Sequence, residues 1–347
     1  MNNGTGLRLT LSLVGGVTAT LLTVAMLFTA GWVRPPIFGV QTGYRGTGQE
    51  QLISVRDKRL VEAANALPDA IDKAAPGGEP ATKAYKNVKI LTDLNTEEFN
   101  RVMVAITQWV SPDQGCAYCH NTENLADDDL YTKIVARRML DMNRHINKNY
   151  KSHVADTGVT CYTCHRGQPV PSNIWFENPG APHAGGMSAH NYGFGHPAKS
   201  NGATALPVDP LTPHLLGDDN IRVEGKTALP TVAGASIQQT EQSFSLMIHM
   251  SEALGVNCTF CHSSRNFGGW DESKPQRTVA WHGLEMMREL NAVYLEPLKA
   301  SYPAHRLGSQ GDAPKANCAT CHQGVSKPLL GQSMAKDFPE LGGKATP

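Results

Sequence analysis

Cys116-Ala117-Tyr118-Cys119-His120 is the first of four pentapeptides in which two cysteines, separated by two residues, are followed by a histidine. The second, third and fourth motifs are Cys161-Tyr162-Thr163-Cys164-His165, Cys258-Thr259-Phe260-Cys261-His262 and Cys318-Ala319-Thr320-Cys321-His322. These motifs contain all eight cysteines of the 347-residue chain. No cysteine is therefore left over for a disulfide or a free thiol.

This pattern is the attachment signature of c-type haem. Two thiols at this spacing form thioether bonds with the two vinyl groups of one porphyrin, and the adjacent histidine binds the iron from one face. A single pair could also be a redox site or half of a zinc site, but neither requires a histidine after every pair. We therefore predict four covalently bound c-type haems. The attaching cysteines are Cys116, Cys119, Cys161, Cys164, Cys258, Cys261, Cys318 and Cys321, and the first iron ligands are His120, His165, His262 and His322.

Charge and composition exclude other classes of protein. The chain has 31 basic and 31 acidic residues, so it lacks the basic footprint of a protein that binds nucleic acid. Aromatic residues make up only 7% of the chain, whereas it contains 33 glycines and 22 prolines. This composition favours short helices separated by extensive irregular loops. We therefore predict a mainly α fold of the multihaem cytochrome c type.

Thioether attachment takes place outside the cytoplasmic membrane, so the chain needs an export signal. Residues 9–33 carry no charge and are bracketed by two arginines. About 20 apolar residues suffice to span a bilayer. We expect an uncleaved, single-pass anchor in the cytoplasmic (inner) membrane, with the haem domain on the periplasmic side. A cleaved signal peptide is the alternative, but Phe28 would occupy the −3 position of a cut after Ala30, where a small residue is preferred.

The rest of the chain divides into segments by composition and periodicity. Residues 171–235 are rich in Pro, Gly, His and Asn and predict a long connecting loop. We predict an anchor at 1–33, an extended segment at 34–90 with one helix near 56–66, a first di-haem unit at 91–170, the connecting loop at 171–235, a second di-haem unit at 236–330 and an irregular tail at 331–347.

An internal repeat relates the two units. Residues 135–144 line up with residues 279–288 at a constant offset of 144, with Val-Ala at the start and a Met-x-Arg or Met-Met-Arg ending. Duplication of one di-haem unit is the simplest explanation. The predicted fold is therefore two pseudo-symmetric di-haem halves plus one N-terminal transmembrane helix.

Apolar stripes at helical spacing precede the motifs, and three of them contain a methionine at an equivalent place. The first of these helices starts at Asn95, which forms a capping-box pattern with Glu98. The three methionines are Met103, Met139 and Met247. A methionine thioether is a common sixth ligand of haem iron and raises its reduction potential. From the pattern alone, Met142 competes with Met139, and Met250 competes with Met247.

The fourth helix breaks this rule, because Gly283 stands where the repeat would place a methionine. Glycine inside a helix costs about 1 kcal/mol relative to alanine, so a packing reason is expected. The missing side chain leaves space for a ligand that arrives from elsewhere. The histidines that could supply it are His153, His282 and His305, among which the pattern does not choose. We expect the histidines of the connecting loop to be solvated: His183, His190, His196 and His214.

The motifs, the methionine-bearing helices and the central loop resemble the tetrahaem cytochrome subunit of purple-bacterial photosynthetic reaction centres. The stretches GVQTGYRGT (39–47), GVTCYTCHRG (158–167) and NCTFCH (257–262) are similar to sequences of that family, and the similarity extends over nearly all of residues 35–330. The resemblance implies that Met103, Met139 and Met247 are the sixth ligands of the first three haems. It also implies that His153 crosses from the first half to the fourth haem.

The same resemblance implies partners and a direction of electron flow. The subunit would dock on the periplasmic face of the core membrane subunits L and M, where its third haem would reduce the photo-oxidised bacteriochlorophyll pair. A small cytochrome c or a high-potential iron–sulfur protein would supply the electrons. Many family members carry a lipid-modified N-terminal cysteine, but no cysteine lies near the apolar segment of this chain. We therefore expect the anchor to be protein.

Two other classes of multihaem protein deserve comparison. A membrane-anchored tetrahaem quinol dehydrogenase also combines one helix with four motifs, but it is shorter and mostly uses histidine pairs. A soluble multihaem reductase keeps one iron open for substrate, whereas here every iron has a possible sixth ligand. We therefore predict an electron-transfer protein and not an enzyme.

Overall fold

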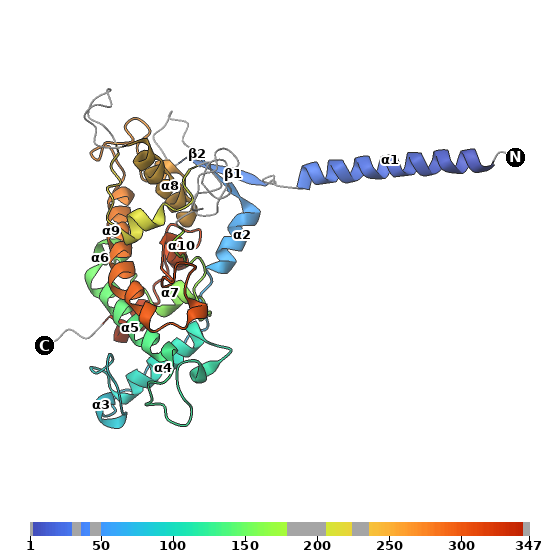
Figure 1. Ribbon diagram of the computed structural model, residues 1–347. Coiled ribbons are helices and arrows are strands. Elements are labelled where there is room, and N and C mark those ends of the chain that lie inside the picture. The colour runs from blue at the N-terminus through green and yellow to red at the C-terminus, as the bar shows by residue number, and fades with distance from the viewer. Residues whose placement is uncertain (1–2, 30–35, 42–49, 179–205, 224–235, 343–347) are drawn as a thin grey trace.

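The structure, a computed structural model, describes residues 3–29, 36–41, 50–178, 206–223 and 236–342. Helices and short helical turns dominate these residues, and the sheet that they contain is one two-stranded hairpin. The predicted fold class, mainly α with extensive irregular loops, is confirmed. Figure 1 shows an elongated body from one end of which a single long helix projects.

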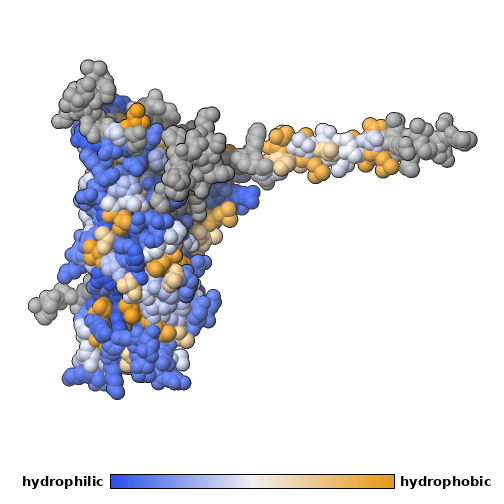
Figure 2. All heavy atoms as spheres, viewed as in Figure 1, coloured by the Kyte–Doolittle hydropathy of each residue, from blue (hydrophilic) through white to orange (hydrophobic). Residues whose placement is uncertain are grey.

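That projecting helix, α1 (Asn3–Thr29), contains the predicted anchor. Its stretch Thr10–Thr29 is long and apolar enough to cross a membrane, and none of it is buried against the rest of the chain. Hydrophobic side chains follow its length in Figure 2, whereas the body is largely hydrophilic. The hydroxyls of Thr18, Thr20 and Thr23 donate to backbone carbonyls one turn earlier, which satisfies them without water. Residues 30–33 of the predicted anchor lie outside the described residues.

A small hairpin and a helix follow the anchor. Strands β1 (Ile37–Gln41) and β2 (Glu50–Ser54) pair in antiparallel fashion. Helix α2 (Val55–Ala64) begins where the Ser54 side chain accepts a hydrogen bond from the backbone of Asp57. The predicted helix near 56–66 is therefore confirmed. The hairpin was not predicted, because Ile37 and Phe38 are adjacent apolar residues and do not alternate with polar ones.

The first half contains the first two motifs and the helices before them. Its helix α4 starts with the predicted capping box, in which Asn95 and Glu98 each accept from the other's backbone, at 2.9 and 3.0 Å. The elements are α3 (Ala81–Ala84), α4 (Thr96–Val110), η1 (Gly115–Tyr118), α5 (Tyr131–Asn149), α6 (Lys151–Val154) and α7 (Cys161–His165).

The second half follows the same order of helix and motif. Its helix α9 continues into a π-helical segment, and a second π-helical segment lies in the described part of the predicted connecting loop. The elements are η4 (Thr212–Leu216), α8 (Ile237–Leu254), η6 (Cys258–Phe260), α9 (Pro275–Glu289), η7 (Leu290–Leu295), η8 (Glu296–Ala300), η9 (Ala304–Arg306), α10 (Cys318–His322), η10 (Pro328–Gly331), η11 (Ala335–Asp337) and η12 (Pro339–Leu341).

The C-terminal turns pack against the first half. Trp109 of α4 meets Phe338 edge to face, with ring centroids 4.6 Å apart. The guanidinium of Arg101 stacks on the same Phe338 ring at 3.8 Å and forms a buried ion pair with Glu340 at 3.2 Å. Because Arg101 is buried with its partner, the tail is an integral part of this core.

The second core cluster lies between α5, η4, α8, α9 and η7. On α8 the buried apolar residues are Leu246 and Ala253, whereas Phe244 is 58% exposed. On α9, Val279 is 41% exposed, and buried residues occur from Gly283 onward. The apolar stripes thus locate the helices correctly, and on α8 the buried Leu246 and Ala253 lie one position before Met247 and Leu254.

Candidate haem sites

Each of the four motifs is a short helical turn. The second and fourth motifs form the α-turns α7 and α10, and the first and third form 3₁₀-turns. In α7 the Thr163 hydroxyl accepts from the backbone of Thr160 at 3.0 Å, and in α10 the Thr320 hydroxyl accepts from Asn317 at 2.9 Å. A helical turn brings residues three apart to one face, so each pair of cysteines faces the same way.

The four motif histidines share one hydrogen-bonding arrangement. In each, Nδ1 donates to a backbone carbonyl three to five residues further on, which fixes the ring and leaves Nε2 as the metal-binding nitrogen. The pairs are His120 with Leu125 at 2.9 Å, His165 with Gln168 at 2.8 Å, His262 with Phe267 at 2.8 Å and His322 with Val325 at 2.9 Å. Histidines oriented in this way, each beside a pair of cysteines, fit covalently attached haem.

The predicted methionines lie on the helices that flank the motifs. Met103 is one turn before Thr107, whose hydroxyl lies 3.9 Å from the sulfur of Cys116. Met139 of α5 lines a cavity of about 530 Å³ together with His165. Met142 and Met250 line the same cavity, and Met247 packs against the core cluster between α8 and α9. The choice between neighbouring methionines therefore stays a prediction.

His153, on the short helix α6, lies between the two halves. Its ring faces that of His322, with centroids 6.0 Å apart. Its Nδ1 donates to the carbonyl of Val279 on α9 at 2.9 Å, so Nε2 is again the nitrogen left for a metal. A Cβ at Gly283 would lie only 2.7 Å from His153 Nδ1. The glycine therefore makes room for this imidazole.

The two other histidines considered from the sequence are placed differently. His282 is half-buried on α9 next to Gly283, and His305 is exposed on η9. Only His153 among the three has its ring in contact with that of His322. The geometry therefore favours His153.

Burial favours the neutral forms of several histidines and cysteines of the second and fourth motifs and of His153. Burial lowers the pKa of His153 and of His165. Burial, and next the charge of His153, lower the pKa of His322 to about 4. Neutral imidazole is the form that binds metals. Burial also raises the pKa of Cys161 to about 12 and that of Cys318 to about 11, so both are thiols at neutral pH.

Asn291, which the sequence analysis did not single out, holds the backbone just before the fourth motif. Its side chain is fully buried in η7 and both donates to and accepts from the backbone of Ala316, at 2.9 Å each. The indole of Trp175 donates to the same carbonyl at 3.0 Å. A lone asparagine in an apolar run was the only sign of this role in the sequence.

The expectation that His214 is solvated is wrong. His214 is 1% exposed, because the neighbouring Leu211 and Leu215 fold it into η4 against α9. Arg288 of α9 donates to the carbonyls of His214 and Asp219, at 2.9 and 2.8 Å, and closes this turn. His183, His190 and His196 lie outside the described residues.

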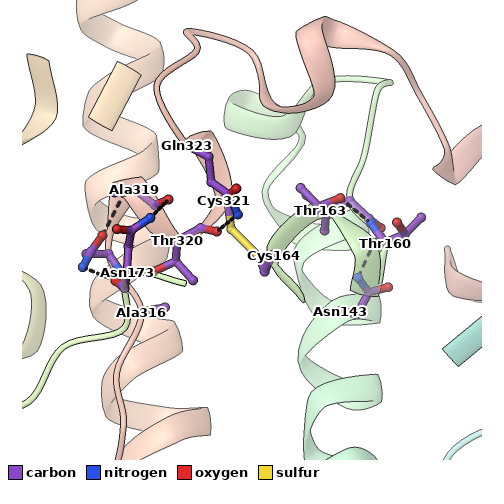
Figure 3. Close-up of a disulfide and its surroundings, with 12 residues drawn as sticks. Asn143, Thr160, Thr163, Cys164, Asn173, Ala316, Ala319, Thr320, Cys321 and Gln323 are labelled. Carbon is purple, nitrogen blue, oxygen red and sulfur yellow. Dashed lines mark hydrogen bonds between the residues drawn. A yellow bond between two sulfur atoms is a disulfide. The ribbon is translucent and has the colours of Figure 1, made fainter. Parts of the chain in front are cut away.

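The second and fourth motifs meet at their second cysteines. Figure 3 shows the sulfurs of Cys164 and Cys321 pointing toward one another and joined in a disulfide, with Cα atoms 4.5 Å apart. This differs from the prediction that each sulfur bonds to a haem. One sulfur cannot form both bonds, so the disulfide and the two thioethers exclude one another.

Further contacts join the second and fourth motifs to each other and to the helices that precede the first and third motifs. Gly167, after the second motif, donates to Trp109 at 2.8 Å, which joins the second motif to α4, the helix before the first motif. Arg166 donates to the carbonyl of Cys321 at 3.3 Å, which joins the second and fourth. Gly324 donates to Ala253 at 2.9 Å, which joins the segment after the fourth motif to α8, the helix before the third motif.

The elements joined in this way run the length of the body. Figure 1 shows α8 at the end that carries the hairpin and α1, and α4 at the opposite end. The order along the molecule is therefore first, second, fourth and third, with the helix before the third motif nearest the anchor.

Comparison with known proteins identifies the family. The family model described as "Photosynthetic reaction centre cytochrome C subunit" matches residues 33–342. The chain is 49% identical to the photosynthetic reaction center cytochrome c subunit of Rubrivivax gelatinosus over 93% of this chain and 88% of the relative. It is 45% identical to the subunit of the same name from Thermochromatium tepidum, over 92% and 79% of the two chains. The chain therefore belongs to the photosynthetic reaction centre cytochrome c subunits.

Proposed function

We propose that this chain holds four c-type haems in a single row and conducts electrons along it, from a soluble periplasmic donor to the photo-oxidised bacteriochlorophyll pair. Membership of the family makes the chain a haem-bearing, membrane-associated electron carrier of the reaction centre. Beyond family membership, we propose the number of haems, their order, their ligands and the partners at each end.

The contacts between the motifs carry this proposal. The second and fourth motifs touch directly, the second contacts the helix before the first motif, and the fourth contacts the helix before the third, which supports the order first, second, fourth and third. The haems supply one-electron chemistry at their irons. The chain attaches them through its cysteines, fixes the orientation of each histidine and surrounds them with apolar helices.

The proposed ligand set combines methionine and histidine at three sites and two histidines at the fourth. Met103, Met139 and Met247 serve the first three haems, and His153 serves the fourth, opposite His322. A bond from histidine nitrogen to a metal is about 2.0–2.1 Å long. Two such bonds, extended to the ring centres, agree with the 6.0 Å between the two rings.

The position of the anchor supports the direction of flow. Helix α8, which precedes the third motif, lies at the end of the body next to the hairpin and α1, and α4, which precedes the first motif, lies toward the far end. We therefore place the core subunits L and M at the end of the third motif, on the periplasmic side of the membrane. A small cytochrome c or a high-potential iron–sulfur protein would dock at the end of the first motif.

Flash spectroscopy tests the function. In membranes that contain the complete reaction centre, a flash should oxidise this cytochrome within microseconds to milliseconds. Cytochrome that stays reduced after the flash, while the bacteriochlorophyll pair stays oxidised, would contradict the proposal.

Substitution of His153 tests the ligand set. His153→Met should raise the reduction potential of one haem, because a thioether raises the potential relative to imidazole. His153→Ala should abolish the bis-histidine signal in low-temperature electron paramagnetic resonance, whereas His282→Ala should leave it unchanged. If the signal survived both His153 substitutions and disappeared in His282→Ala, the fourth ligand would be His282.

A further inference from the structure

An arginine and three tyrosines gather at one end of the haem cavity. The rings of Tyr131 and Tyr302 meet edge to face, with centroids 6.0 Å apart. Tyr118, from the first motif, and Arg306, from η9, interact electrostatically with Tyr302. All four residues line the cavity of about 530 Å³. Two tyrosines of the first half, Tyr118 and Tyr131, thus converge with Tyr302 and Arg306 of the second half.

The charged residues in the described lining of the cavity are all positive. Its described lining contains three cationic residues, Arg306, Lys315 and Lys327, and neither aspartate nor glutamate. The buried Lys315 is already paired with Asp312 at 2.5 Å, and Lys327 is exposed. The half-buried Arg306 has no carboxylate within 4.0 Å in the part of the chain that the structure describes. A partly buried guanidinium on such a wall is stabilised by a nearby anion.

Helix α5 relates this cluster to the second motif. The backbone before that motif is held at Val159 by Asn143 and Asn147, in the C-terminal half of α5. Tyr131 opens the same helix, 12 residues before Asn143, which is roughly 18 Å along the axis at 1.5 Å per residue. Met139 lies between the two ends and lines the cavity.

A haem attached at Cys161 and Cys164 would therefore lie along α5 with its thioether edge beside Asn143. Its opposite edge, which carries two propionate carboxylates, would point toward Tyr131 and Arg306. The haem of the first motif does not fit this position, because Tyr118 stands between the cysteines of that motif and so marks its thioether edge.

We propose that Arg306, with the hydroxyls of Tyr118, Tyr131 and Tyr302, binds the propionates of the haem attached at Cys161 and Cys164. This inference rests on the proposed function, since it requires a haem at the second motif. Arginine presents a planar array of N–H donors that matches a carboxylate. The second half would thereby hold a haem of the first half, as His153 of the first half reaches the fourth haem.

A guanidinium beside a propionate offsets its negative charge and favours the reduced iron. Arg306→Gln should therefore lower the reduction potential of the second haem, and Arg306→Lys should lower it less, because lysine keeps the charge without the planar array. Tyr302→Phe should also lower it, by removing one hydrogen-bond donor. Lys299→Gln, which removes an exposed positive charge from the neighbouring η8, is the matched control and should change nothing.

The experiment is a redox titration of the full chain, with haem content measured for each variant. Met139→His serves as a marker, because it should move the wave of the second haem to lower potential. In the Met139→His background, Arg306→Gln should lower that same wave further. If it moved another wave or none, the propionate site would be refuted and the proposed function would stand. If Met139→His itself moved no wave, the ligand set would fail and this inference with it.

Discussion

At the scale of single residues, the neighbouring ring of His153 explains why position 283 is a glycine. A Cβ there would lie 2.4 Å from Cε1 and 2.7 Å from Nδ1 of the His153 ring, which is closer than real Cβ atoms come to their neighbours. The glycine also occupies the middle of α9, where alanine would otherwise be better by about 1 kcal/mol. The sign of the stability change in Gly283→Ala therefore distinguishes a glycine that makes room for His153 from a glycine that the helix merely accommodates.

Gly283→Ala should destabilise the protein despite its better helix propensity, because the His153 ring must move. We expect a lower free energy of unfolding by denaturant and loss of the bis-histidine resonance signal. Gly15→Ala in α1, where nothing lies within 4 Å of the new Cβ, is the matched control. A Gly283→Ala variant that is about 1 kcal/mol more stable and keeps the signal would refute this role.

The second question at this scale is whether the sulfurs of Cys164 and Cys321 bond to haems or to each other. If both sulfurs carry haem, mass analysis of the purified holoprotein should give the chain mass plus four haems. Digestion should then yield no peptide pair linked through Cys164 and Cys321. Recovery of that linked pair from protein with a full haem content would contradict the assignment of these two cysteines to haem.

At the scale of elements, α9 and its π-helical continuation support both sides of the fourth site. Val279 accepts from His153, Gly283 gives its ring room, and Asn291 holds the backbone before the motif of His322. The π-helical geometry of η7 places Asn291 inside the core, between Ala316 and Leu215. Widened helical turns of this kind are frequent at functional sites.

Elements with strong local signals could be predicted from the sequence, and elements made by distant contacts could not. The capping box of α4 and the glycine of α9 are visible in the sequence because neighbouring residues decide them. The burial of His214 and the place of Arg306 depend on chain segments more than 70 residues away. No periodicity in their own segments encodes these contacts.

The register of α8 can be tested through its two methionines. Met247→His should lower the reduction potential of the third haem, because imidazole favours the reduced iron less than a thioether does, and should thereby increase the driving force for its electron donation to the oxidised pair. Met250→Leu should leave that potential unchanged. If Met250→Leu removed a methionine–iron absorption band and Met247→Leu did not, the ligand would be Met250.

At the scale of the whole molecule, the row of motifs does not follow the order of the chain. The fourth motif lies between the second and the third, so the two halves are interleaved through it. Its proposed ligand His153 comes from the first half, and the haem of the second motif would be held by Arg306 from the other half. Neither half is therefore complete without its partner.

The order first, second, fourth and third predicts which substitution interrupts electron transfer along the haems. His153→Ala, at the fourth site, should slow re-reduction of the third haem by the first two, because every electron from them must pass that site. Met103→His, at the far end, should alter only exchange with the soluble donor. Double-flash absorption spectroscopy on membranes measures both rates, since the first flash oxidises the third haem and the second flash reports its recovery. If His153→Ala left that recovery at its original rate while the haem content stayed at four, the fourth site would not lie between the second and the third.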